Sequence, residues 1–157
     1  MYRGESGKWF NGNGYRLNLD REVVFIVPDE VEKREAIEIS TYPIKRSQPF
    51  EFSMKGVEQE EVDFSLKQTY FFDSNKLNLP LTLRKWKQGD RIKPLGMKGS
   101  KLVSDVLIDA KVPQSQKEKV YVLVSKENIS AIIGFGISED FKLEADTRNI
   151  MSFSWKQ

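Results

Sequence analysis

The stretch LTLRKWKQGDRIKPLGMKGSKLVSDVLIDAKVP, residues 81–113, decides the fold because its hydrophobic period changes from that of a strand to that of a helix. Its opening residues, 81–86, predict a strand. The glycines and prolines that follow predict a turn at 88–90 and then an irregular loop. Residues 101–110 place apolar side chains on one helical face, and Ser100 is the expected N-cap. Pro113 bars continuation of this helix, and residues 115–119 predict one further helical turn.

Short segments on both sides of this stretch predict strands, because their apolar residues alternate or run continuously. They are residues 15–19, 23–27, 36–40, 50–54, 62–66, 70–72, 120–124, 129–135, 141–145 and 150–155. The first two are joined by a turn and predict a hairpin. With roughly ten short strands and one clear helix near residues 101–110, the predicted fold class is α+β, mainly β.

The length of 157 residues suits one ordinary domain. We expect residues 1–14 to be a linker or an artificial start, and residues 15–157 to form a single domain. Within that domain, residues 15–80 form a strand-rich acidic half and residues 81–147 form a basic half. One domain is expected because neither half has enough strands to close a good core alone.

The composition excludes several kinds of enzyme. The chain has no cysteine and no histidine, which rules out thiol catalysis, disulfides and zinc sites built from these residues. No apolar run approaches the ~18 residues that cross a membrane. The opening residues, MYRGESG, lack the apolar core of a signal peptide. We therefore expect a cytoplasmic protein that makes no membrane contact, and the composition favours binding over catalysis.

Charge is unevenly distributed, although the net charge is only +2. Residues 84–119 hold ten Lys or Arg and four Asp or Glu, which gives +6, whereas residues 20–63 hold six and twelve, which gives −6. A basic block of this density is what phosphate binding requires, because cations that neutralise phosphates release condensed counterions. A solvated lysine-rich face beside an acidic one accounts for the same counts, and charge alone does not decide between the two.

Most of this positive charge falls in residues 84–101, which we call the basic segment. Its glycines let a nucleic-acid backbone approach closely, and the helix expected to follow it adds N–H groups that favour an anion. Alternatively, Gly89-Asp90 is only a turn, and Leu95 and Met97 are only core residues. Both interpretations hold together if the loop packs through Leu95 and Met97 and presents its charges outward.

Two carboxylates, Asp105 and Asp109, lie one helical turn apart. Such a pair can hold magnesium or act as acid and base, which would make the chain an independent enzyme. Because Lys101 and Lys111 are nearby in sequence, salt bridges that fix the helix or the loop are the favoured interpretation. Trp86 could stack on bases, but an isolated tryptophan is more often a core residue.

An ordered, ungapped series of short motifs carries a resemblance to a known family. The series is Gly89-Asp90-Arg91, Pro94-Leu95-Gly96-Met97, Gly99, Lys101-Leu102, Ser104-Asp105, Ile108-Asp109 and Lys111-Val112-Pro113. It resembles the C-terminal signature of the tRNA(Ile)-lysidine synthetases, over about residues 81–147. The resemblance implies a β-sandwich-like, tRNA-binding C-terminal domain of the type shared with the β chain of phenylalanyl-tRNA synthetase.

The resemblance also implies a role without catalysis. Enzymes of that family are ligases that use ATP to adenylate the wobble cytidine of an isoleucine tRNA with a CAU anticodon, and free lysine then displaces AMP to give lysidine. ATP, Mg²⁺ and lysine are used by an N-terminal domain with an SGGxDS phosphate loop, and no such motif occurs here. The chain is thus expected to hold no cofactor and to bind the acceptor-stem side of that tRNA. Its other expected partner is the N-terminal domain, with a homodimer possible.

Carried onto this sequence, the resemblance assigns site residues. The expected tRNA contacts are Arg84, Arg91, Lys93, Lys98, Lys101, Lys111 and Lys117. The residues expected to shape or orient the loop are Gly89, Asp90, Pro94, Gly96, Gly99, Asp105 and Asp109. The chain departs from the family where relatives often carry an arginine, since residues 134–138 read GFGIS. The competing hypothesis is a dimerisation or interdomain packing module with incidental basic charge.

Overall fold

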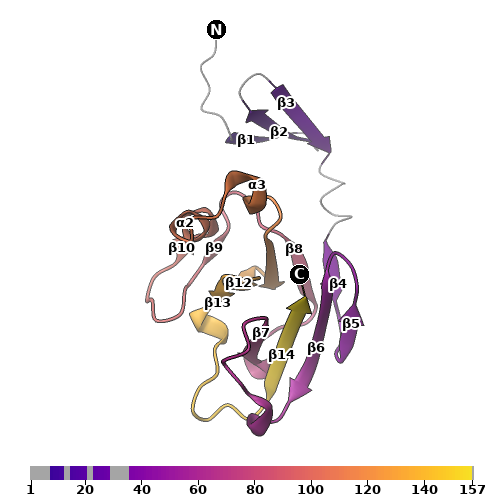
Figure 1. Ribbon diagram of the computed structural model, residues 1–157, viewed down its shortest axis with the longest axis vertical. Coiled ribbons are helices and arrows are strands. Elements are labelled where there is room, and N and C mark those ends of the chain that lie inside the picture. Colours follow the sequence, from indigo (N-terminus) through magenta and orange to yellow (C-terminus); the bar gives the residue numbers. More distant parts are fainter. Residues whose placement is uncertain (1–7, 13–14, 21–22, 29–35, 157) are drawn as a thin grey trace. The chain divides into compact units, whose positions relative to one another are not determined.

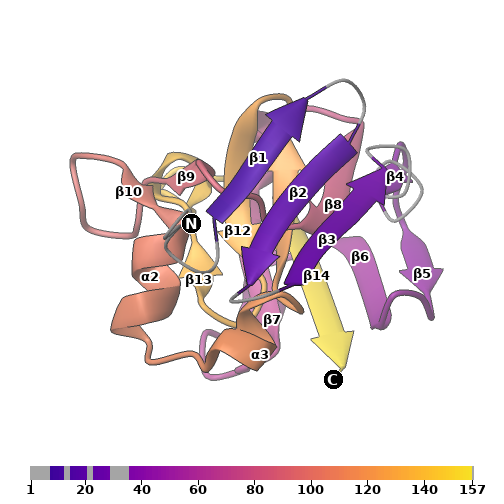
Figure 2. The same ribbon diagram turned by 90° about the horizontal axis from the view of Figure 1, so that it is seen from above.

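The computed structural model describes residues 8–12, 15–20, 23–28 and 36–156, and the chain divides into two compact units, residues 1–36 and 37–157. The first unit holds a three-stranded antiparallel sheet of β1 (Lys8–Gly12), β2 (Tyr15–Asp20) and β3 (Val23–Pro28), side by side in Figure 2. The predicted hairpin is confirmed as β2–β3. Strand β1 lies in the segment expected to be a linker. That residues 15–157 form one domain stays a prediction.

The second unit contains two antiparallel sheets (Figure 1). The five-stranded sheet has the order β13-β12-β11-β8-β4, and the four-stranded sheet has the order β5-β6-β14-β7. Their strands are β4 (Ile37–Ile39), β5 (Ile44–Arg46), β6 (Glu51–Val57), β7 (Thr69–Asp73), β8 (Leu81–Lys85), β11 (Tyr121–Ser125), β12 (Asn128–Ile132), β13 (Gly136–Ile137) and β14 (Ile150–Lys156). The predicted class, mainly β with a sandwich-like arrangement, is confirmed.

The main hydrophobic core lies between these two sheets. Phe52, Phe72 and Phe153 from the four-stranded sheet pack with Leu83 and Leu123 from the five-stranded sheet, and all five side chains are fully or almost fully buried. Ring contacts reinforce the layer, since Phe52 and Phe153 stack with centroids 5.4 Å apart. A sandwich results because each sheet turns alternate side chains towards the other.

A second core covers the opposite face of the five-stranded sheet. It contains Val122 and Val124 of β11 together with Val103 and Leu107 of α2 (Val103–Asp109). Because β11 is buried on both faces, its sequence reads as a continuous apolar run instead of an alternating one. A short helix, α3 (Gln114–Lys117), follows α2, and β9 (Arg91–Ile92) pairs with β10 (Lys101–Leu102) beside it. No helix in the described part of the chain is long and apolar enough to cross a membrane.

Several boundary predictions are wrong, each for a local reason. Ser100 is not the N-cap, because residues 101–102 pair with β9 and the helix begins only at Val103 after Leu102. Residues 62–66 form a turn instead of a strand, since the Asp63 carboxylate accepts from the amide of Ser65. Residues 141–145 form no strand, because Phe141 ends the 3₁₀ turn η3 (Glu139–Phe141) and residues 142–145 are irregular. The two other 3₁₀ turns are η1 (Gln59–Glu61) and η2 (Ser74–Lys76).

Candidate nucleic-acid interface

The base of the basic segment is an ion pair between Arg84, near the end of β8, and Asp90, after the following turn. The pair is bidentate, with Nη1–Oδ2 and Nη2–Oδ1 distances of 2.8 and 3.0 Å. Its side chains are only 20% and 14% exposed. The Asp90 carboxylate also accepts from the amide of Lys87 at 2.7 Å, and Gly89 supplies the positive φ of 89° that the turn requires. Asp90 therefore holds the turn at the base of the basic segment, and the Arg84 guanidinium is held in this ion pair.

Arg91 closes the neck of the loop that follows. Its Nε donates to the hydroxyl of Ser100 at 2.8 Å, and its Nη2 donates to the Ser100 carbonyl at 3.1 Å. The backbone of the neck is held by β9–β10 pairing, in which Arg91 lies opposite Leu102. Arg91 is an exposed residue. These bonds fix its guanidinium at the surface and leave further N–H donors for a ligand.

The tip of the loop is held by acidic residues about forty positions later in the chain. The Glu139 carboxylate accepts from the amide of Gly96 at 2.8 Å, and the Glu139 amide donates to the Lys93 carbonyl at 2.8 Å. Lys93 in turn pairs with Asp140 at 3.0 Å. Leu95 is 52% exposed, so the expectation that the loop packs through Leu95 and Met97 as core residues is wrong. The loop is anchored by polar contacts instead.

Electrostatics reinforces this anchor. The Lys142 ammonium and the Gly96 amide hold the pKa of Glu139 below its ordinary value, and Glu139 raises the pKa of Lys142. Sequence reasoning missed Glu139 and Asp140. The available signal was Ser138, which caps η3 by accepting from the amide of Asp140 at 3.3 Å. A serine followed by two acids marks such a turn, although it does not reveal the loop against which the turn packs.

The carboxylates of α2 lie on its exposed face. Asp109 forms an ion pair with Lys101, which confirms part of the predicted salt bridging. Asp105 is exposed and has no ion pair among the residues that the structure describes. No group of three or more potential acidic metal ligands occurs in the described part of the chain. The first amide of the helix is not available to an anion, because the Val103 N–H donates to the Asp90 carbonyl at 2.8 Å.

The remaining predicted contacts are Lys98, in the loop between β9 and β10, and two lysines that follow α2. Lys98 and Lys111 are exposed, and Lys117 is half-buried at the end of α3. The Lys117 carbonyl accepts from Nε1 of Trp86 at 2.6 Å, and Trp86 packs against the second core. Trp86 is thereby a structural residue with a satisfied ring N–H. Lys98 adds an exposed cation within the basic segment, and Lys111 and Lys117 add cations after α2 and at the end of α3.

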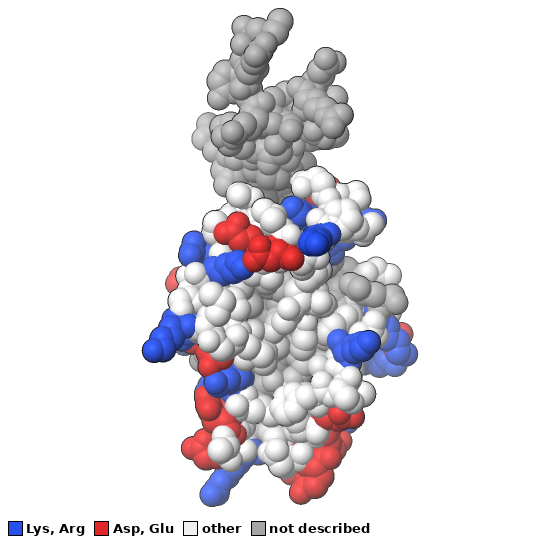
Figure 3. All heavy atoms as spheres, turned by 60° about the vertical axis from the view of Figure 1, so that its left-hand side comes forward, with Lys and Arg blue, Asp and Glu red and all other residues white. Residues whose placement is uncertain are grey.

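A hollow of about 380 Å³ opens beside the base of the basic segment. Its lining combines cations and hydroxyls with carboxylates and an amide, from Gly89, Asp90, Arg91, Ile92, Lys93, Ser100, Glu127, Asn128, Ile129, Ser138 and Asp140. On the face drawn in Figure 3, basic side chains form separate patches with acidic ones between them. Positive charge on this face is therefore divided among separate patches and does not form one continuous basic surface.

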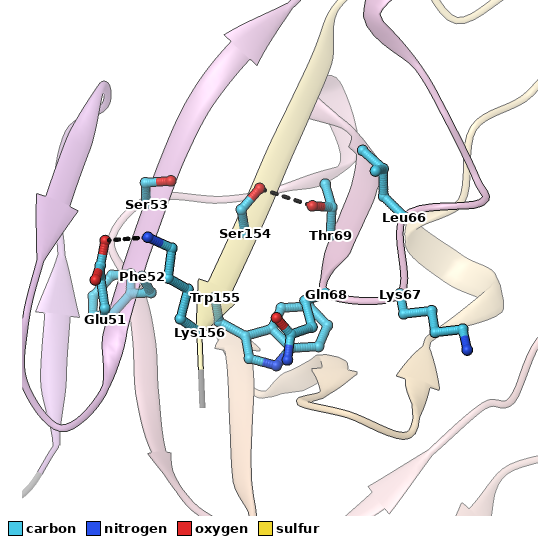
Figure 4. A pocket seen from close by; sticks show the side chains of 10 residues that line it. All are labelled: Glu51, Phe52, Ser53, Leu66, Lys67, Gln68, Thr69, Ser154, Trp155 and Lys156. Carbon is cyan, nitrogen blue, oxygen red and sulfur yellow. Dashed lines mark hydrogen bonds and ion pairs between the residues drawn. The ribbon is translucent and has the colours of Figure 1, made fainter.

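A larger hollow, of about 490 Å³, lies on the outer face of the four-stranded sheet (Figure 4). Hydroxyls line its floor, and those of Thr69 and Ser154 lie 3.0 Å apart. Lys156 at its margin pairs with Glu51 at 3.3 Å, and Glu51 also pairs with Lys45. These two cations hold the pKa of Glu51 below its ordinary value. Lys67, which also lines this hollow, is exposed and has no ion pair among the described residues, so the hollow carries one cation besides the Lys156–Glu51 pair.

Comparison of the fold with solved structures defines the class of domain. A crystal structure of a TilS C-terminal domain matches with a TM-score of 0.63 and 18% identity, covering 78% of this chain and 98% of that one. An N-terminal fragment of the phenylalanyl-tRNA synthetase β-subunit from Pyrococcus horikoshii matches with a TM-score of 0.53 and 18% identity, covering 76% and 47%. The second unit thus has the β-sandwich fold found in both proteins.

Sequence comparison gives the family. Residues 81–155 match the model of the TilS substrate C-terminal domain, and this part of the chain belongs to that family. Two tRNA(Ile)-lysidine synthases are similar over nearly the whole chain. That of Parabacteroides distasonis is 31% identical over 94% of this chain, and that of Bacteroides thetaiotaomicron is 31% identical over 96%. The chain spans 34% and 33% of their lengths. The family resemblance predicted from the motifs is confirmed.

Proposed function

We propose that this chain is the tRNA-recognition domain of a tRNA(Ile)-lysidine synthase and performs no chemistry itself. It grips the acceptor-stem side of an isoleucine tRNA with a CAU anticodon. A separate N-terminal domain then converts the wobble cytidine to lysidine with ATP, Mg²⁺ and lysine, in the cytoplasm. The proposal rests on the family of the chain and on the way in which the basic segment is built.

One observation carries the proposal: the basic segment is anchored at both its base and its tip. Asp90 fixes the base through Arg84, and Glu139 fixes the tip through the Gly96 amide at 2.8 Å. If the basic segment were only a solvated lysine-rich surface, its position would not need to be fixed by these contacts. Double-stranded RNA is recognised chiefly by shape, phosphates and 2′-hydroxyls, which calls for cations held at fixed positions. We assign Arg84 to positioning, and the other six predicted cations to RNA contact.

The test is a titration of the chain with the isoleucine tRNA and with its isolated acceptor-stem helix, each at low and moderate salt. We expect both to bind, with log affinity falling by roughly 3–5 per decade of salt if about the same number of phosphates is contacted. Arg91→Glu combined with Lys101→Glu should abolish binding while thermal unfolding stays cooperative.

The matched control is Lys67→Glu with Arg148→Glu, because both residues are exposed, lie outside the basic segment and undergo the same charge change. This control should bind within about twofold of wild type, since distant exposed charges are screened. A folded Arg91/Lys101 variant with wild-type affinity would sink the proposal. Equal losses in the control would also sink it, because they would show that only net charge matters.

An interdomain packing role is the second candidate. It is favoured by Phe64 and Leu66, whose side chains are 76% and 48% exposed, and Leu66 lines the hollow of Figure 4. Sedimentation without RNA discriminates self-association, since a monomer at high protein concentration removes it. Replacing Phe64 by Ser should leave tRNA binding unchanged if the basic segment alone is responsible.

A further inference from the structure

Two lysines at the ends of the exposed loop are each held by a carboxylate. Lys93, which precedes the loop tip, pairs with Asp140 at 3.0 Å, and Lys101, which ends the loop, pairs with Asp109. The acids are 56% and 63% exposed, and the lysines are 33% and 31% exposed. Lys98 lies between them in sequence and has no acidic partner among the described residues. The two pairs therefore bracket the loop.

These pairs differ from the one at the base of the segment. The Arg84–Asp90 pair is bidentate and mostly buried, and Asp90 also holds the turn through the Lys87 amide. Separating it would leave charges with little access to water, so it belongs to the framework. An exposed single-contact lysine pair contributes little to stability. A phosphate can therefore displace Asp140 or Asp109 at small cost, although each acid stays nearby and repels the incoming anion.

We propose that Asp109 and Asp140 are specificity-determining residues, which hold the two lysines at fixed points and weaken the binding of anions that do not match those points. This inference rests on the proposed function. A free lysine follows whatever phosphate approaches, because its stem is flexible. A lysine that is paired with a carboxylate exchanges it only for a phosphate that reaches the position where the pair holds the ammonium group.

The consequence depends on the shape of the RNA. An A-form stem presents phosphates at a fixed spacing, so it can meet both lysines at once and offset the repulsion from the two acids. A single strand must be ordered to do the same, and it loses conformational entropy in the process. The acids therefore oppose every polyanion, but they oppose a flexible one more.

The experiment compares three proteins: the wild-type chain, Asp109→Asn with Asp140→Asn, and the control Glu60→Gln with Asp146→Asn. Both replacements are close in shape to the native residues, and both double variants gain the same charge. Glu60 and Asp146 are exposed, lie outside the basic segment and have no ion pair among the described residues. Each protein is titrated with an acceptor-stem helix and with a single-stranded RNA of equal length, at two salt concentrations.

We expect the Asp109/Asp140 variant to bind the single strand about tenfold more tightly and the stem at most about threefold more tightly, because two screened carboxylates are neutralised. Its salt slope on the single strand should steepen by up to about two phosphates. The control should change neither affinity by more than about twofold. An equal gain on both RNAs, no gain on the single strand, or a matching gain in the control would overturn the inference.

Failure of the proposed function gives a different result. Wild-type titration with the stem tests that function, and absence of stem binding contradicts it. The ratio between variant and wild type on the single strand is measured at low salt, where a cationic surface binds RNA without regard to sequence. That ratio is obtained whatever the stem does, so an unchanged value refutes the role of the two acids by itself.

Discussion

Removing the Asp90 carboxylate should destabilise the second unit far more than removing any exposed acid. Asp90→Ala leaves the Arg84 guanidinium without its bidentate partner in a site where that side chain is only 20% exposed. Breaking a fully buried ion pair costs about 3–5 kcal/mol, and the partial exposure here places the cost near 3 kcal/mol. Loss of the bond from the Lys87 amide adds roughly 1 kcal/mol.

The assay is urea and thermal unfolding of the purified chain, followed by circular dichroism. A loss of about 3–4 kcal/mol lowers the unfolding midpoint of a domain this size by roughly 10 °C. A second variant, Asp90→Ala with Arg84→Leu, isolates the pair. Its loss should be smaller than the sum of the two single losses, because no unpaired guanidinium remains.

Two results would refute this reasoning. A midpoint that falls by less than about 3 °C in Asp90→Ala would mean that the pair is no stronger than an exposed one. Additive losses in the double variant would mean that Arg84 and Asp90 act independently. In either case the basic segment would need another anchor.

Three further predictions concern packing and titration. Leu107→Ala should lower the free energy of unfolding by about 2–5 kcal/mol, because Leu107 is fully buried on the inner face of α2. Its neighbour Ile108 is 56% exposed, so Ile108→Ala should change that free energy by no more than about 0.5 kcal/mol. Urea unfolding of both variants measures the difference. Because the pKa of Glu139 is lowered in the folded state, its carboxylate stabilises the fold at neutral pH, and this stabilisation is lost as pH falls below 4.5 through the folded-state pKa. Glu139→Gln should therefore reduce the fall in melting temperature that occurs at acid pH. Burial raises the pKa of Tyr70 to about 12 from 10.0, so the free energy of unfolding should fall as pH rises above 10.0 towards 12. Tyr70→Phe should remove that fall, and phenolate absorbance reports the ionisation.

The layers of the fold could be predicted because the strongest periodic signals lie in the core. The continuous apolar run of β11 and the alternation in β14 both matched observed strands, and the helical face of residues 103–107 matched buried positions. The three-residue strand β4 was predicted because residues 36–40 alternate, whereas the short strands β5 and β9 were missed because no alternation extends beyond their two or three residues. They exist because neighbouring strands supply their hydrogen bonds.

The candidate site divides in the same way. The turn at Gly89-Asp90 could be predicted, since the residues that form it lie close together in sequence. The partners Glu139 and Asp140 could not, because the chain must fold before residues 47 positions apart, such as Lys93 and Asp140, meet. The start of α2 was predicted too early for a similar reason, because residues 101–102 pair with β9 in a sheet and the helix begins only after them.

The central position of β14 constrains how the chain can fold. This strand lies between β6 and β7, and it pairs Trp155 with Phe52 and Met151 with Phe72. A ribosome releases residues 51–73 long before residues 150–156, and during that interval β6 and β7 have no strand between them. Pairings of such long range slow folding and leave apolar edges open to aggregation. The four-stranded layer can therefore be completed only after residues 150–156 are made, and until then β6 and β7 each present an unpaired edge to other chains.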